Sequence, residues 1–112
     1  YYYTVDIMVE GEAPVRTLDS AHALHLIRIV QEALANAVKH ASASVIRVES
    51  TLEEGRWRLC VSDNGTGFET SRPPGVPDSN GLAHMRERAA EAGFGFSIVS
   101  DKDTGTRVCI LV

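Results

Sequence analysis

The fold is decided by residues 31–41, which read QEALANAVKHA. Apolar side chains recur here and just upstream at the spacing of one helix face. The apolar arc holds Leu26, Ile27, Val30, Ala33, Leu34, Ala37, Val38 and Ala41, and the opposite arc holds Arg28, Glu32, Asn36, Lys39 and His40. Glu32 and Asn36 are four residues apart and therefore neighbours on the helix surface. Taken alone, this pattern is typical of an amphipathic helix with a solvated outer face, although asparagine is a poor helix former.

Length, charge and composition indicate one ordinary globular domain. The chain has 112 residues, which is enough for a single core. Its formal net charge of −4 favours neither a nucleic-acid partner nor a membrane surface. No apolar run approaches the length of a membrane span, and no signal peptide is expected at its start. Because the sequence begins at Tyr1 without a methionine, we expect a domain excised from a longer protein.

The two cysteines, Cys60 and Cys109, lie in apolar stretches and lack the spacing of a metal site. We therefore expect buried free thiols in a reducing compartment.

The rest of the chain divides into short strands, one long loop and a second helix. Asp19 or Ser20 is expected to cap the long helix, and Gly93 to end the second one. In chain order, the patterns predict a strand at 2–9, a turn at 10–12, an extended piece at 14–18, a helix at 20–41, a hairpin of strands 44–52 and 56–63, a loop at 64–80, a helix at 81–92, and strands at 94–100 and 106–112. Two helices covering one face of such a sheet make an α+β two-layer sandwich.

One carboxylate stands out because of its place in a strand. Asp63 ends the strand 56–63 and shares the parity of its apolar residues, so it points to the buried side of the sheet. A carboxylate there is costly unless it finds hydrogen-bond donors. Thr106 has the same inward parity in the last strand. The strand pattern alone therefore makes Asp63 a candidate site residue.

Three glycine-containing elements follow the long helix. The first, DNGTGF at 63–68, lets the backbone turn sharply and approach a ligand, and it matches neither the P-loop nor the dinucleotide fingerprint. The second, NGL at 80–82, opens the second helix, whose free N–H groups can hold a phosphate. The third is Gly105-Thr106. Each one alone is equally typical of an ordinary turn or helix entry.

Taken together and in this order, the motifs resemble those of the GHKL ATPase superfamily. QEALANAVKHA resembles its N box, DNGTGF its G1 box, NGLAHMRERA its G2 box and GTRV its last glycine-threonine element. The NGLAHMRERA string is most similar to the nitrate-sensor and DesK-type branch of bacterial two-component sensor histidine kinases. The resemblance covers residues 20–112. It implies the Bergerat ATP-binding fold, with a mixed sheet and helices on one face, and the catalytic and ATP-binding domain of such a kinase.

The resemblance also implies roles for ten residues. Asn36 would coordinate Mg²⁺, Glu32 would orient or deprotonate a water, and Lys39 and His40 would face the phosphates of ATP. Asp63 would accept a hydrogen bond from the adenine amino group, assisted by Thr106. The glycines and the residue beside them would approach the nucleotide by their backbones; these are Gly65, Gly67, Gly81 and Leu82. Arg86 and Arg88 are interpreted either as surface residues or as further site residues.

The same resemblance implies partners outside this segment. A histidine kinase needs a phosphoacceptor histidine on a separate dimerisation domain, and nothing here supplies it. His25 is followed by Leu26, not by an acidic residue, and lies on the long helix, while His22 and His84 are interpreted as surface residues. We expect ATP, Mg²⁺, the dimerisation domain and a response regulator as partners, no contact with nucleic acid, and a cytoplasmic location, either free or as the cytosolic part of a membrane-anchored sensor.

Two alternatives remain open from the sequence. One is a non-catalytic regulatory domain of the same fold, against which the presence of both Glu32 and Asn36 argues. The other is a serine kinase of the anti-sigma type, against which the NGLAHMRERA string argues.

Overall fold

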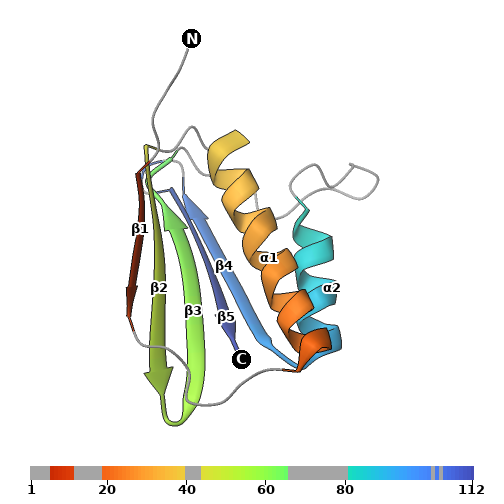
Figure 1. Ribbon diagram of the computed structural model, residues 1–112. Helices are drawn as coiled ribbons and strands as arrows, with labels where there is room; N and C mark the ends of the chain where they lie inside the picture. Colours follow the sequence, from red (N-terminus) through yellow and green to blue (C-terminus); the bar gives the residue numbers. More distant parts are fainter. Residues whose placement is uncertain (1–5, 12–18, 40–43, 66–80, 102, 104) are drawn as a thin grey trace.

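A computed structural model describes residues 6–11, 19–39, 44–65, 81–101, 103 and 105–112. These residues form β1 (Asp6–Gly11), α1 (Ser20–Lys39), β2 (Val45–Glu53), β3 (Arg56–Asp63), α2 (Leu82–Ala92), β4 (Gly95–Asp101) and β5 (Gly105–Leu111). The strands make one sheet in the order β1-β2-β3-β5-β4. Strand β1 runs parallel to β2, and the other neighbours are antiparallel. Both helices lie on the same side of this sheet (Figure 1). The predicted two-layer α+β sandwich with a mixed sheet is confirmed.

Most element boundaries agree with the sequence pattern to within one or two residues. The exception among the described residues is the first turn, because Glu10 and Gly11 continue β1 alongside β2. The predicted extended piece at 14–18 and residues 66–80 of the predicted loop 64–80 lie outside the described residues. No helix in the described part of the chain is both long and apolar enough to cross a bilayer.

The core fills the space between the helices and one face of the sheet. Alternate residues of the strands point into it, as period-two alternation requires. The largest fully buried side chains are Ile29, Ile46, Met85 and Ile110. Helix α2 contributes to this core through Leu82, Met85 and Ala89, which are all buried.

The orientation of α1 differs from the prediction by a rotation about its axis. Asn36 is only 4% exposed, whereas Ile27 and Val38, which were expected to face inward, are 52% and 40% exposed. Ile29 is fully buried. Because α1 packs against α2 as well as the sheet, a wider arc of the helix is covered than the sheet alone would cover, and Ile29 and Asn36 fall within that arc. The amide of Asn36 is therefore on the protected side of the helix.

The predicted start of α1 and the predicted end of α2 are both confirmed. The carboxylate of Asp19 accepts the backbone N–H of His22 (2.9 Å) and so caps α1. This hydrogen bond, followed by the bond to the His22 side chain, lowers the pKa of Asp19. The stabilisation is present above the ordinary pKa of aspartate and disappears as the pH falls through the lowered value. Gly93 ends α2 with φ 73°, and its N–H donates to Ala90.

The cysteine prediction is wrong in one respect. Cys60 and Cys109 are buried as expected, but they form a disulfide. They are directly opposite each other in the antiparallel register of β3 and β5. Side chains at such positions lie on the same face of the sheet within bonding reach. The pairing could not be foreseen before the strand order was known.

Candidate functional site

Several elements that carry predicted site residues come together at one end of the molecule. The second half of α1, the end of β3, the start of α2 and the start of β5 all lie at the upper end in Figure 1. The hairpin between β2 and β3 lies at the opposite end. The topology therefore gathers the N-box helix and the three glycine elements, which are far apart in the sequence.

The carboxylate of Asp63 is held by two backbone donors. Its Oδ1 atom accepts the N–H of Gly65 (2.8 Å) and the N–H of Thr106 (3.4 Å). Asp63 is half-buried and Gly65 is buried. Both bonds end on Oδ1, so Oδ2 can accept a donor from a ligand. The structure thus places Thr106 beside Asp63, with its backbone N–H directed at the carboxylate.

The backbone at the start of β5 lies very close to the backbone at the end of β3. Gly105 has φ 94°, and a Cβ built on it would lie 2.1 Å from the backbone oxygen of Asp63. Thr106 is only 5% exposed, and its Oγ1 lies 2.8 Å from Oγ of Ser100 on β4. Only glycine fits at position 105, which explains the Gly-Thr order of this element.

Asn64 was not predicted as a site residue, yet it fixes the end of β3. Its Oδ1 atom accepts the backbone N–H groups of Ser44 (3.0 Å) and Val45 (2.9 Å). Its Nδ2 atom donates to Oγ of Ser44 (2.9 Å). The side chain thereby ties the loop after β3 to the start of β2. The signal in the sequence is an asparagine directly after the strand, a residue that bonds nearby backbone groups well.

Helix α1 presents Glu32 to the start of α2. A Cβ on Gly81, which has φ 68°, would lie 2.3 Å from Oε1 of Glu32. The carboxylate of Glu32 therefore lies against the entry of α2. One turn farther along α1, Asn36 is buried and bonded. Leu82, the first residue of α2, is buried in the core.

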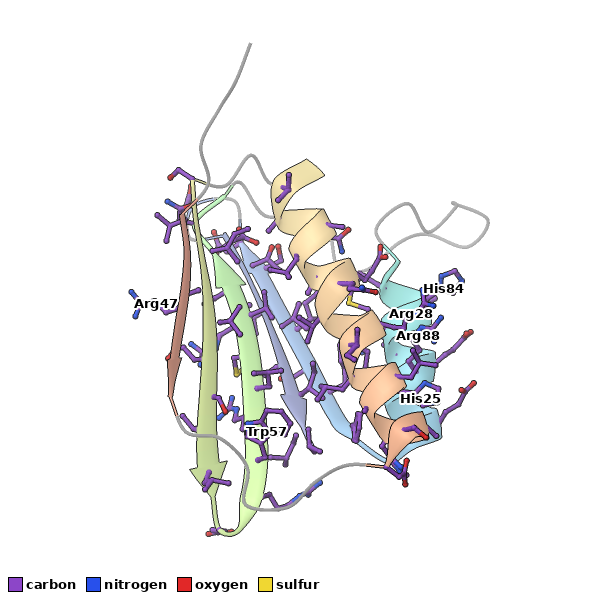
Figure 2. The ribbon with its side chains drawn as sticks, viewed as in Figure 1. His25, Arg28, Arg47, Trp57, His84 and Arg88 are labelled. Carbon is purple, nitrogen blue, oxygen red and sulfur yellow. A yellow bond between two sulfur atoms is a disulfide. The ribbon has the colours of Figure 1, made fainter. Side chains whose placement is uncertain are left out.

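A cavity of about 290 Å³ lies between α1 and α2. It is lined by Arg28, Gln31, Glu32, Ala35, His84, Met85 and Arg88. Figure 2 shows Arg28, His84 and Arg88 gathered along the outer side of the helix pair. Asp63 lines a different cavity, together with Val45, Arg47, Ser62 and Asn64 at the ends of β2 and β3. The sequence left Arg86 and Arg88 open: Arg88 borders the cavity beside Glu32, whereas Arg86 lies over the ring of Phe96 (5.4 Å to the centroid).

Three predicted site residues cannot be placed. His40 and Gly67 lie outside the described residues, and so does the side chain of Lys39. The resemblance further predicts that Asn36 and Asp63 line one cavity, and this stays a prediction, since Asn36 lines neither of the two cavities described above.

The fold and this set of elements define a nucleotide-binding ATPase domain of the histidine kinase type. Residues 21–112 match the family described as "Histidine kinase-, DNA gyrase B-, and HSP90-like ATPase". The chain belongs to this family, which confirms the resemblance drawn from the motifs.

Relatives and solved structures agree with this assignment. "Sensor protein VraS" of Staphylococcus epidermidis (strain RP62A) is 43% identical over 84 residues, covering 75% of this chain and 24% of the relative. VraS of Staphylococcus aureus (strain COL) is 42% identical over 84 residues, which again cover 75% of this chain and 24% of the relative. The ATP binding domain of PrrB from Mycobacterium tuberculosis aligns with TM-score 0.71 and 25% identity, covering 96% of this chain and 79% of that domain. The blue-light activated histidine kinase of Erythrobacter litoralis EL346 aligns with TM-score 0.79 and 23% identity, covering 99% of this chain and 36% of that protein, which supports the fold. The chain spans about a quarter of the length of its VraS relatives.

Proposed function

We propose that this domain binds Mg-ATP and donates the γ-phosphoryl group to a histidine on a separate dimerisation domain, which passes it to a response regulator. The observation that carries the proposal is the carboxylate of Asp63. It is half-buried at the end of β3 and held by the N–H groups of Gly65 and Thr106. A carboxylate oriented in this way is suited to accept a bond from an amino group on a planar base.

Asp63 is proposed to anchor adenine through its Oδ2 atom. Guanine presents a carbonyl oxygen where adenine has its amino group, so a carboxylate selects adenine. Thr106 is proposed to assist through its hydroxyl, which the bond to Ser100 orients. Gly65 and Gly67 are proposed to let the backbone pass close to the base.

The metal and phosphates are proposed to lie beside α1. Asn36 offers an amide oxygen from a protected position, and Glu32 offers a carboxylate one turn away. The described residues bring together no cluster of three or more His, Cys, Asp or Glu side chains. This donor set suits Mg²⁺, which takes one or two protein oxygens and completes its shell with water and phosphate. When bound, the cation would neutralise charge on the transferring phosphoryl group.

The chain's own residues are proposed to orient the reactants. Glu32, which touches the helix entry at Gly81, would orient or deprotonate a water. The N–H groups at the start of α2, beginning with Gly81 and Leu82, would meet the phosphates. Lys39 and His40 are proposed to face the phosphates.

The acceptor histidine and the response regulator are proposed to be supplied from outside this segment. His25 lies on α1 with its Nε2 3.6 Å from Oε2 of Glu91 on α2. By analogy with the sensor proteins it resembles, the domain is proposed to face the cytosol.

The direct test is binding followed by transfer. A fluorescent ATP analogue with Mg²⁺ should bind the isolated domain, and the full-length protein should transfer labelled phosphate to an upstream histidine. The phosphate should be released by acid, as expected of a phosphohistidine. Failure to bind at millimolar nucleotide would overturn the proposal. Acid-stable phosphate would favour the serine kinase, and binding without transfer would favour the non-catalytic domain.

Gly81→Ala should reduce phosphoryl transfer at least tenfold, because the new methyl group would overlap Glu32 and displace its carboxylate. Gly93→Ala is the matched control. Gly93 also has a left-handed backbone, with φ 73°, but a Cβ there meets nothing within 4 Å. Both variants should lose about 1–2 kcal/mol of unfolding free energy from backbone strain. Equal transfer rates in the two variants would show that contact with Glu32 is unimportant.

A further inference from the structure

The disulfide lies on the face of the sheet that no helix covers in the described structure. Cys60 alternates with Leu59 and Val61, which belong to the core under the helices, so its side chain points the other way. Arg47 of β2 shares this open face and in Figure 2 points away from both helices. Asp63, the proposed adenine anchor, has the opposite parity to Cys60 on β3.

The bridge nevertheless joins the two strands that carry the proposed adenine anchor. Cys60 is three residues before Asp63 on β3, and Cys109 is three residues after Thr106 on β5. Two cross-strand pairs separate the disulfide from that contact, Val61 with Val108 and Ser62 with Arg107. The disulfide therefore lies about 10 Å along the strands from the hydrogen bond between Thr106 and Asp63. A change in the spacing of β3 and β5 at the disulfide can reach that bond over this short distance.

The bridge is buried but accessible at one edge. Cys60 is 3% exposed and Cys109 is 6% exposed. A cavity of about 280 Å³ reaches Cys109 and is also lined by Arg58, Gly95, Phe96, Ser97 and Leu111. Arg107 donates through its Nε–H to Sγ of Cys109 (3.4 Å). A neighbouring guanidinium stabilises a thiolate, so Cys109 is a favourable leaving group in thiol–disulfide exchange.

We propose that Cys60 and Cys109 form a thiol–disulfide switch that sets the affinity of the adjacent ATP site and is opened by a dithiol. This inference rests on the proposed function. In a cytosolic protein, disulfides that do form are usually transient or redox-sensing.

The exchange is balanced by the dithiol alone. One thiolate of the reductant enters by the cavity and attacks Sγ of Cys109. The Cys60–Cys109 bond breaks, Cys60 leaves as a thiolate and takes up a proton, and a mixed disulfide remains on Cys109. The second thiol of the reductant then attacks the reductant's first sulfur, which is bonded to Cys109 in the mixed disulfide. Cys109 is released as a thiolate, which Arg107 stabilises. The reductant loses two electrons and two protons and ends as a cyclic disulfide.

Opening the bridge removes the covalent limit on the separation of β3 and β5. The backbone hydrogen bonds of the ladder remain, so the domain stays folded while local opening becomes more frequent. Binding at Asp63 requires the closed ladder, because Thr106 holds the carboxylate from β5. The reduced domain should therefore bind ATP more weakly than the oxidised one.

The test compares oxidised and dithiothreitol-reduced wild-type domain. Mass spectrometry should show a gain of two hydrogen atoms on reduction, and the Kd of a fluorescent ATP analogue should rise at least threefold and recover on reoxidation. Amide exchange should accelerate at residues 61–63 and 106–108. The control is the double variant Cys60→Ser/Cys109→Ser. Its Kd should match that of the reduced wild type and should be the same with and without reductant.

The outcomes separate this inference from the proposed function. Equal ATP affinity in both redox states overturns the switch and leaves the ATP site standing. Binding in neither state overturns the proposed function and the coupling with it. A chain that contains no disulfide after oxidation, or whose disulfide resists dithiothreitol, also overturns the switch. If the double variant fails to fold, the two states of the wild type still decide, since they need no substitution.

Discussion

Asp63→Asn should raise the Kd for ATP at least tenfold. The N–H groups of Gly65 and Thr106 both donate to Oδ1, so an asparagine would keep its oxygen at that position. Its NH₂ group would then replace Oδ2 and face the amino group of adenine, donor against donor. A hydrogen bond to a charged acceptor is worth about 1.5–3 kcal/mol, and each 1.4 kcal/mol corresponds to about tenfold in affinity.

Nucleotide choice provides the sharper readout for this variant. The wild-type domain should prefer ATP to GTP, and Asp63→Asn should narrow or reverse that preference, since NH₂ can donate to the guanine carbonyl. Asp103→Asn is the control, because Asp103 is exposed in the turn between β4 and β5. It removes the same charge and should leave both affinities unchanged. An unaltered ATP affinity in Asp63→Asn would mean that Asp63 does not bind adenine.

Gly105→Ala should be the most damaging single methyl group in the chain's candidate site. The new Cβ would lie 2.1 Å from the backbone oxygen of Asp63 and 3.0 Å from its Oδ1. Backbone cannot move aside as a flexible side chain can, so β3 and β5 must separate. We expect a fall of about 2–4 kcal/mol in the free energy of unfolding by urea denaturation, together with loss of detectable ATP binding.

Gly55→Ala separates the overlap from backbone strain. Gly55 also has a positive φ, 80°, in the hairpin between β2 and β3, but a Cβ there meets nothing within 4 Å. This variant should lose only about 1–2 kcal/mol and bind ATP normally. If both variants lost the same free energy of unfolding and still bound ATP, the close approach of β5 to Asp63 would not be needed for ATP binding.

The sequence predicted best where one face of an element is simply apolar. The parity of β3 put Asp63 and its apolar neighbours on the same face, and β5 gave Thr106 the same direction, because alternation in a strand is fixed by covalent geometry. The start of α2 and its end at Gly93 followed from local chemistry for the same reason. These features depend on nothing outside a few consecutive residues.

The errors arose where two distant elements meet. The polar character of Asn36 predicts a place on the outer arc of α1, but α1 packs against α2 as well as the sheet, and Asn36 is buried. Ile27 and Val38 were assigned inward because they are apolar, and they are exposed. The partner of Cys60 is set by the strand order, which periodicity does not contain. The pairing of β2 with β3 is also absent from the periodicity of the sequence. The role of Asn64 depends on this pairing, because its partners lie 19 and 20 residues away.

The most direct measurement is a crystal structure of the domain with Mg²⁺ and a non-hydrolysable ATP analogue. The account predicts one nucleotide site in which the adenine amino group is within hydrogen-bonding distance of Asp63 and Mg²⁺ is bound by the side-chain oxygen of Asn36. A nucleotide held elsewhere, or Asn36 and Asp63 on surfaces that no single nucleotide can span, would contradict it.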